Sequence, residues 1–143
     1  AAIGGTSGIL IQFPLYFGIM GIMSGTGLVE ALSMAMVRLA TPETFELWTV
    51  LSAGIVNVFV PSGGGQWAVQ GPLLIRAALD LGVPLDRTIL AMAYGDELTN
   101  MLQPFWALPL LGITGLAAKD ILPYTVRFLA VGLATCLILT VLF

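Results

Sequence analysis

Apolar residues dominate both ends of the chain, in runs over residues 3–23 and 122–143, and broken apolar stretches fill most of the space between them. A helix needs about 20 apolar residues to cross a hydrocarbon core about 30 Å thick. The two end runs therefore predict transmembrane helices over residues 7–24 and 121–143.

A shorter apolar stretch over residues 27–40 carries Glu30 and Arg38. It is too short to span a bilayer and has the pattern typical of a helix that lies at the membrane surface. The next residues, Thr41 and Pro42, suit a helix start, with Thr41 as the cap and Pro42 in the first helical position. We therefore expect an interfacial helix over residues 27–40 and a new helix from residue 42.

The middle of the chain is interrupted by a polar, glycine-rich segment, Val60-Pro61-Ser62-Gly63-Gly64-Gly65-Gln66-Trp67. Helices on either side, over residues 42–59 and 66–81, would be about 27 Å and about 24 Å long at 1.5 Å per residue, somewhat shorter than the hydrocarbon core. The turn between them has no spare length to reach water. The pattern predicts a re-entrant helical hairpin over residues 42–81 with its tip at residues 61–66, and two tilted full spans are the alternative.

A second polar interruption, Gly95-Asp96-Glu97-Leu98-Thr99-Asn100, follows within another apolar region. Irregular backbone at membrane depth is tolerated only where it is packed in protein or lines a cavity. We therefore expect a broken transmembrane helix over residues 86–117, unwound at residues 95–100. Two interrupted helices in one chain are typical of the binding site of a secondary transporter.

The glycine-rich tip suits a carboxylate. The free N–H groups and the positive dipole end of a helix that starts near the tip stabilise an anion. Ser62 and Gln66 add donors, and Trp67 can contact an alkyl tail. The candidate substrate-binding residues are Ser62, Gly63, Gly64, Gly65, Gln66, Trp67, Thr99 and Gln103.

The second interruption suits a coupling ion, because ionisable groups at membrane depth are costly and usually serve an ion or proton path. Oxygen-rich side chains suit Na⁺, whereas a carboxylate that can take up a proton suits H⁺, and the sequence does not choose between them. The structural alternative is a helix cap or a paired buried charge. The candidate ion-coupling residues are Asn57, Asp96, Glu97 and Asn100.

Composition narrows the class of protein. The 143 residues are 58% hydrophobic and 9% charged, which indicates an integral, all-α membrane protein. A net charge of −3 provides no basic patch for nucleic acid. The chain has no histidine and one cysteine, Cys136. It therefore lacks the usual ligands for zinc or haem and the usual Cys/His nucleophile pair. We expect that the protein binds no cofactor and is not an enzyme.

The polar segments also resemble a known family. The motifs, with the opening segment Leu10-Ile11-Gln12-Phe13-Pro14, are similar to those of the short-chain fatty acid transporter (AtoE-like) family: Asn57-Val58-Phe59-Val60-Pro61-Ser62-Gly63-Gly64-Gly65-Gln66-Trp67 and Gly95-Asp96-Glu97-Leu98-Thr99-Asn100-Met101-Leu102-Gln103-Pro104-Phe105-Trp106. The resemblance implies uptake of acetoacetate or butyrate across the bacterial inner membrane by a multi-pass carrier.

The same resemblance implies kinship with the ion-transporter superfamily, whose inverted repeats each carry a re-entrant hairpin and an unwound helix. The chain begins without Met and ends within an apolar run. It would then be the carboxy-terminal part of a longer transporter and form one half of its inverted repeat, and the other half would complete the site. We also expect that the transporter can form a homodimer. A carrier of di- or tricarboxylates in the same superfamily is the alternative.

Two other classes compete with a carrier. Tyr94-Gly95-Asp96 is similar to part of an intramembrane aspartyl protease site, but position 93 is Ala93 and no second intramembrane aspartate provides the partner that two-carboxylate chemistry needs. A serine protease of the rhomboid type would need a histidine. A third alternative is a membrane subunit of a larger complex that does not itself transport.

Overall fold

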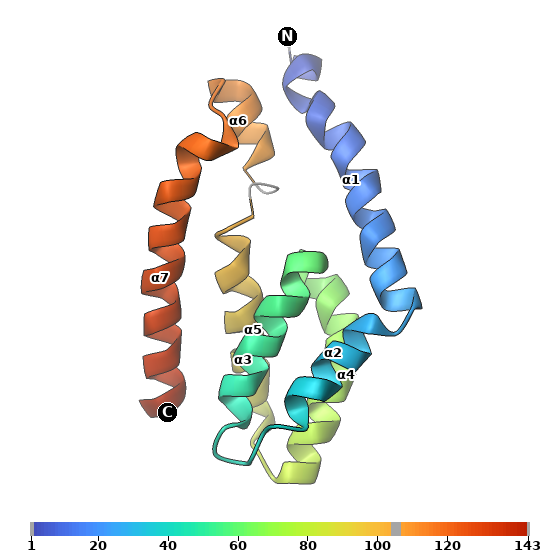
Figure 1. Ribbon diagram of the computed structural model, residues 1–143, viewed down its shortest axis with the longest axis vertical. Helices are drawn as coiled ribbons and strands as arrows, with labels where there is room; N and C mark the ends of the chain where they lie inside the picture. The colour runs from blue at the N-terminus through green and yellow to red at the C-terminus, as the bar shows by residue number, and fades with distance from the viewer. Residues whose placement is uncertain (1, 104–106, 143) are drawn as a thin grey trace.

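The computed structural model describes residues 2–103 and 107–142; for residues 2–9, 12, 141 and 142 it describes the backbone only. Within these ranges the chain forms α-helices and no β-strand, so the predicted all-α class is confirmed (Figure 1). The helices are α1 (Ala2–Gly25), α2 (Leu28–Val37), α3 (Phe45–Phe59), α4 (Gly63–Leu81), α5 (Leu85–Asn100), α6 (Leu108–Thr114) and α7 (Ala118–Leu142).

Helices α3 and α4 form a hairpin, joined by residues 60–62. Its tip lies about halfway along the long axis of the molecule, level with the middle of α7 (Figure 1). Helix α5 rises beside α3, and these two helices form the most extensive helix pair. We call the opposite end of the hairpin, where α3 begins and α4 ends, the base.

The hairpin differs in detail from the sequence-based expectation. Helix α3 begins at Phe45, three residues later than expected, because residues 42–44 form a turn in which the Thr41 N–H donates to Thr44 Oγ1 at 2.9 Å. Helix α4 begins at Gly63, so the glycines lie in its first turn. The glycines therefore do not form the turn between α3 and α4, and none of Gly63, Gly64 and Gly65 has a positive φ.

The expected unwinding at residues 95–100 is also wrong. Helix α5 continues through all six residues and ends at Asn100, and the next helix begins at Leu108. Close packing explains Gly95: a Cβ there would collide with the Val50 carbonyl oxygen and would lie 2.9 Å from the Gly54 nitrogen. A glycine that the sequence presented as a helix breaker is therefore a contact point between α3 and α5.

Helix α2 packs against both helices of the hairpin. Two apolar clusters hold the three helices together. The tip cluster contains the buried residues Met23, Val29, Val56 and Val60. The base cluster contains Phe45, Ala53, Leu74, Ala78, Val83 and Met92. Because Val29 is 0% exposed, α2 contributes a side chain to the core of the hairpin. The place of α2 at the membrane surface stays a prediction.

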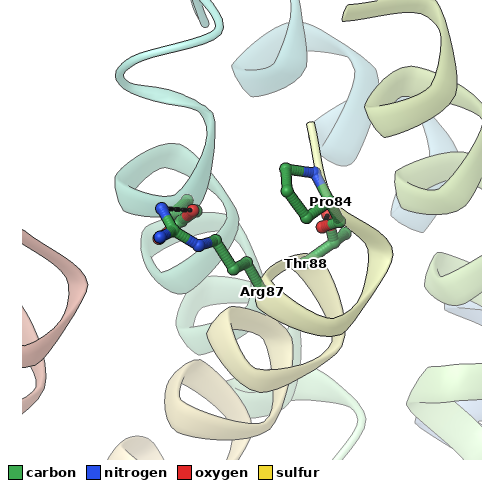
Figure 2. A network of polar contacts seen from close by, with 4 residues as sticks. Pro84, Arg87 and Thr88 are labelled. Atoms are coloured by element: carbon green, nitrogen blue, oxygen red, sulfur yellow. Dashed lines mark hydrogen bonds and ion pairs between the residues drawn. The ribbon is translucent and has the colours of Figure 1, made fainter. Parts of the chain in front are cut away.

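Charged side chains gather at the ends of the helices. At the base, Arg87 reaches from α5 to α3, where its Nη1 lies 3.4 Å from Glu46 Oε1 (Figure 2). In the same turn of α5 the Thr88 hydroxyl donates to the Pro84 carbonyl oxygen at 3.0 Å (Figure 2). Lys119 and Asp120 lie at the start of α7, at the other end of the molecule (Figure 1).

Among the described residues, one helix segment, Ala118–Thr140, is long and apolar enough to cross a membrane by itself. Phe13–Gly25 and Leu28–Val37 pass the same test as a pair, with a 60° bend between them. Large apolar side chains on α1 and α7, such as Ile11 and Phe128, are more than 60% exposed. This arrangement is consistent with a membrane protein.

Candidate functional site

The two polar segments meet where the first turn of α4 faces the last turns of α5. A Cβ added to Gly63 would lie 3.4 Å from Oδ2 of Asp96. The carboxylate of α5 therefore lies beside the amino-terminal end of α4, where the helix dipole favours negative charge.

The amino-terminal end of α4 retains free donors. Ser62 caps the helix: its hydroxyl accepts from the Gly65 N–H at 3.3 Å, and its carbonyl oxygen accepts from the Gln66 N–H at 2.7 Å. Within residues 2–103 and 107–142, the N–H groups of Gly63 and Gly64 make no hydrogen bond. Both glycines are exposed, so two amides and the positive end of α4 are open to an anion.

Asn57, near the end of α3, fastens α5 to the hairpin. Its side chain is 0% exposed, and its Nδ2 lies 2.8 Å from the Asp96 carbonyl oxygen. The same nitrogen lies 2.9 Å from both Thr99 Oγ1 and Asn100 Oδ1. The two hydrogens of this amide group are thus shared among three acceptors near the end of α5, and they set where Asp96 lies relative to the tip.

Gln103 binds the end of α3 from the segment that follows α5. Its Nε2 donates to the carbonyl oxygen of Asn57 at 2.9 Å and lies 3.3 Å from that of Val58. The last carbonyl groups of a helix lack partners within it, so this contact satisfies groups that would otherwise be unpaired. Gln103 therefore joins the break after α5 to the hairpin.

Three buried oxygen atoms in this region have no hydrogen-bond partner among the residues that the structure describes: Asn57 Oδ1, Asp96 Oδ1 and Gln103 Oε1. The ion pairs of the described chain, Arg76 with Asp80 and Arg87 with Glu46, leave Asp96 without a basic partner. Unpaired buried oxygens are uncommon, and a carboxylate with two amide oxygens is a suitable ligand set for a hard cation.

Comparison with known proteins identifies the family. The family model described as short-chain fatty acid transporter matches residues 1–143. The chain belongs to the short-chain fatty acid transporter family. It is 45% identical over 129 residues to a protein of Escherichia coli (strain K12), covering 90% of this chain and 29% of that protein. It is also 45% identical over 119 residues to a protein of Haemophilus influenzae (strain Rd), covering 83% of this chain and 27% of that protein.

Both relatives are provisionally named short-chain fatty acid transporters. The chain spans less than a third of the length of either one, since it covers 29% and 27% of them. No solved structure matches the chain.

In this member of the family, two expected tip residues point away from the tip. The Gln66 side chain is 0% exposed and lies between α3 and α4, where its Nε2 donates to the Ala53 carbonyl oxygen at 2.9 Å. The Trp67 ring lies along its own helix, 2.8 Å from the place of a Cβ on Gly71. The structure does not bring these two side chains to the tip amides, because the helix starts at Gly63 and turns them toward other neighbours. Their role as substrate contacts stays a prediction.

Glu97 is exposed on α5, next to the half-buried Asp96. Other polar residues were missed by sequence reasoning. Ser52 and Gln70 are each at most 1% exposed and lie within the hairpin, and Ser33 of α2 is 0% exposed. The spacing of Gln66 and Gln70, four residues apart on one helix, was the available signal.

We expect Asn57→Leu to lower the apparent melting temperature of the full-length protein by several degrees. Leucine nearly matches the size of asparagine but offers no donor, so the acceptors on α5 lose their partner at a cost of about 2 kcal/mol or more. Thermal unfolding in detergent measures the change. Val58→Leu, which introduces the same side chain at the exposed neighbouring position, is the control. Equal melting temperatures for the two variants would contradict the role of Asn57.

Proposed function

We propose that the full-length protein is a secondary transporter that takes up short-chain monocarboxylates such as butyrate or acetoacetate across the bacterial inner membrane. The proposal rests on the family match over residues 1–143 and on one observation, the approach of the Asp96 carboxylate to Gly63 at the start of α4. The rest of the transporter would close the site from the side on which Gly63 and Gly64 are exposed.

In this proposal, the α3–α4 hairpin is re-entrant, and α5, which ends at Asn100, is the first half of a broken transmembrane helix. Support comes from the height of the tip, which is level with the middle of α7 (Figure 1). A second support is length: the 15 residues of α3 make a helix about 22 Å long, short of a core about 30 Å thick. The glutamate and arginine pair at the base would then lie near one membrane surface.

The free N–H groups of Gly63 and Gly64 would hold the carboxylate of the substrate. Asp96 lies at the same place, so two negative charges would be brought close together. Unit charges about 4 Å apart repel by about 4 kcal/mol at an effective dielectric constant of about 20, which is about a thousandfold in affinity. Substrate binding therefore requires a Na⁺ ion or a proton at Asp96, and this requirement couples the two movements.

For Na⁺, the ligands would be Asp96 Oδ1, Asn57 Oδ1 and Gln103 Oε1, the three buried oxygens without partners in the described chain. Thr99 and Asn100 would position Asn57 through their hydrogen bonds to its Nδ2. For H⁺, protonation of Asp96 would remove the repulsion directly.

A monocarboxylate suits this tip better than a dicarboxylate. The tip offers one pair of free amides, at Gly63 and Gly64, and no side chain on either residue. At Gly65, the Ser62 hydroxyl and the Met20 sulfur lie 3.2 Å and 3.3 Å from the place of a Cβ, and a thioether accommodates an alkyl tail.

We expect butyrate to raise the apparent melting temperature of the full-length protein, because a ligand at 100 times its dissociation constant stabilises the folded state by about 2.7 kcal/mol. The shift should require Na⁺ or acidic pH, and choline at neutral pH is the control. Succinate should give a smaller shift. A non-transporting subunit would show no ligand effect under any of these conditions, and that result would contradict the proposal.

A further inference from the structure

A layer of polar side chains crosses the interior of the α2–α3–α4 unit, away from the tip. Its members are each at most 1% exposed: Ser33, Thr49, Ser52, Gln66 and Gln70. Members of both apolar clusters adjoin this layer along the helices: Val56 of the tip cluster follows Ser52 after about one turn, and Leu74 of the base cluster follows Gln70 after about one turn. Polar groups this deeply buried are costly unless they are hydrogen-bonded.

Part of the layer forms a directed chain of hydrogen bonds. The amide of Gln66 donates to Gln70 Oε1 at 2.8 Å as well as to the Ala53 carbonyl oxygen. Gln70 Nε2 donates to Ser52 Oγ at 3.0 Å, and Ser52 Oγ donates to the Thr49 carbonyl oxygen at 3.2 Å. Both amide hydrogens of Gln66, one amide hydrogen of Gln70 and the Ser52 hydroxyl hydrogen are therefore engaged.

The register of α2 places Ser33 at the same level. Val29, about one turn before it, belongs to the tip cluster. Val37, about one turn after it, packs against the base cluster. Residues four apart lie on one face of a helix, so Ser33 faces the hairpin. On the hairpin, Gln66 Nε2 binds the carbonyl oxygen of Ala53, which is one turn after Thr49, so Gln66 and Thr49 lie at neighbouring levels.

Three oxygen atoms of the layer remain without a partner among the described residues: Ser33 Oγ, Thr49 Oγ1 and Gln66 Oε1. They come from three different helices. The hydroxyl groups of Ser33 and Thr49 can donate or accept, whereas Gln66 Oε1 can only accept, so the three atoms suit a guest that both donates and accepts. No carboxylate belongs to the layer, so a cation there would be a buried charge without a counter-charge.

We propose that this layer holds an ordered water molecule, bound by Ser33 Oγ, Thr49 Oγ1 and Gln66 Oε1. A neutral guest that both donates and accepts fits three acceptor-capable oxygens, and buried waters typically make about three hydrogen bonds. The water joins α2 to both helices of the hairpin. The three helices thus form one unit held by a hydrated contact that is separate from the site at Asp96.

The sign of a stability change tests the proposal. Thr49→Val removes the hydroxyl and keeps the shape of the side chain. If water is bound, the variant leaves it short of one partner, and the apparent melting temperature of the full-length protein should fall by about 2 °C or more. If the layer is dry, the variant removes an unpaired buried hydroxyl and the melting temperature should rise, which would overturn the proposal.

A double-mutant cycle adds a second test. Ser33→Ala should also lower the melting temperature, and together with Thr49→Val it should lower it by less than the sum of the two shifts, because both variants weaken one shared water. Additive shifts would overturn the proposal. Thr88→Val is the matched control, since the Thr88 hydroxyl is buried but bonded to its own helix, and it should be additive with Ser33→Ala.

The same cycle distinguishes water from an ion. The shifts should be equal in Na⁺, K⁺ and choline buffers. A loss of stability that appears only in Na⁺ would assign the guest as a cation and overturn the proposal of water. If Thr49→Val does not fold, the direction of the shift for Ser33→Ala alone, which removes only one oxygen atom, decides between a hydrated and a dry layer.

Discussion

Asp96→Asn is expected to abolish cation-driven accumulation of butyrate in proteoliposomes while preserving exchange of labelled for unlabelled butyrate. The amide matches the shape of the carboxylate but carries no charge, so the substrate anion no longer meets a repulsion of about 4 kcal/mol at the tip. Butyrate then binds without a cation, so a cation gradient no longer drives its accumulation. Accumulation should fall at least tenfold, to the level at which the inside and outside concentrations are equal.

Exchange separates loss of coupling from loss of folding, because a misfolded variant loses both activities. Asp86→Asn is the matched control, since it makes the same change at an exposed position in the first turn of α5. It should accumulate butyrate as the wild type does. An Asp96→Asn variant that still accumulates butyrate with the gradient would remove Asp96 from the coupling role.

Gly95→Ala is expected to be strongly destabilising, although it adds one methyl group. That group would collide with the Val50 carbonyl oxygen and lie 2.7 Å from the Ala53 Cβ, and both are part of a packed helix pair. The helices must separate, at a cost of about 1–3 kcal/mol or more for overpacking. The separation would also move Asp96, the next residue, away from Gly63, so both the melting temperature and butyrate uptake should fall.

The control for this variant is Gly18→Ala in α1, where no atom lies within 4 Å of the added group. In a helix interior, alanine is favoured over glycine by about 1 kcal/mol, so this variant should be neutral or slightly stabilising. If Gly95→Ala were as stable as Gly18→Ala, the close crossing of α3 and α5 would be contradicted.

Sequence reasoning located the hairpin and the polar residues because burial in lipid leaves few alternatives. A glycine-rich polar segment between two short apolar helices has to be a turn, and the structure has one at residues 60–62. Helix α5 ends at Asn100 and not at Tyr94, a difference of about 1.7 turns at 3.6 residues per turn. A glycine next to polar residues resembles a helix end in sequence, whereas Gly95 is required by a neighbour, α3, that is distant in sequence.

The direction of individual side chains was harder to predict. Gln66 belongs to the conspicuous tip motif, yet a helix start at Gly63 instead of Gln66 turns its side chain into the hairpin. The polar layer was missed for a related reason. Ser33, Thr49 and Gln70 are ordinary residues within their own segments, and only the packing of α2 against the hairpin brings them together.

A cryo-electron microscopy structure of the full-length protein in a lipid nanodisc, with butyrate and Na⁺ present, tests the central claim most directly. The account predicts that the hairpin tip lies near the middle of the bilayer and that density for a carboxylate lies between the amides of Gly63 and Gly64, next to Asp96. A tip at the membrane surface, or a substrate bound away from Asp96, would contradict it.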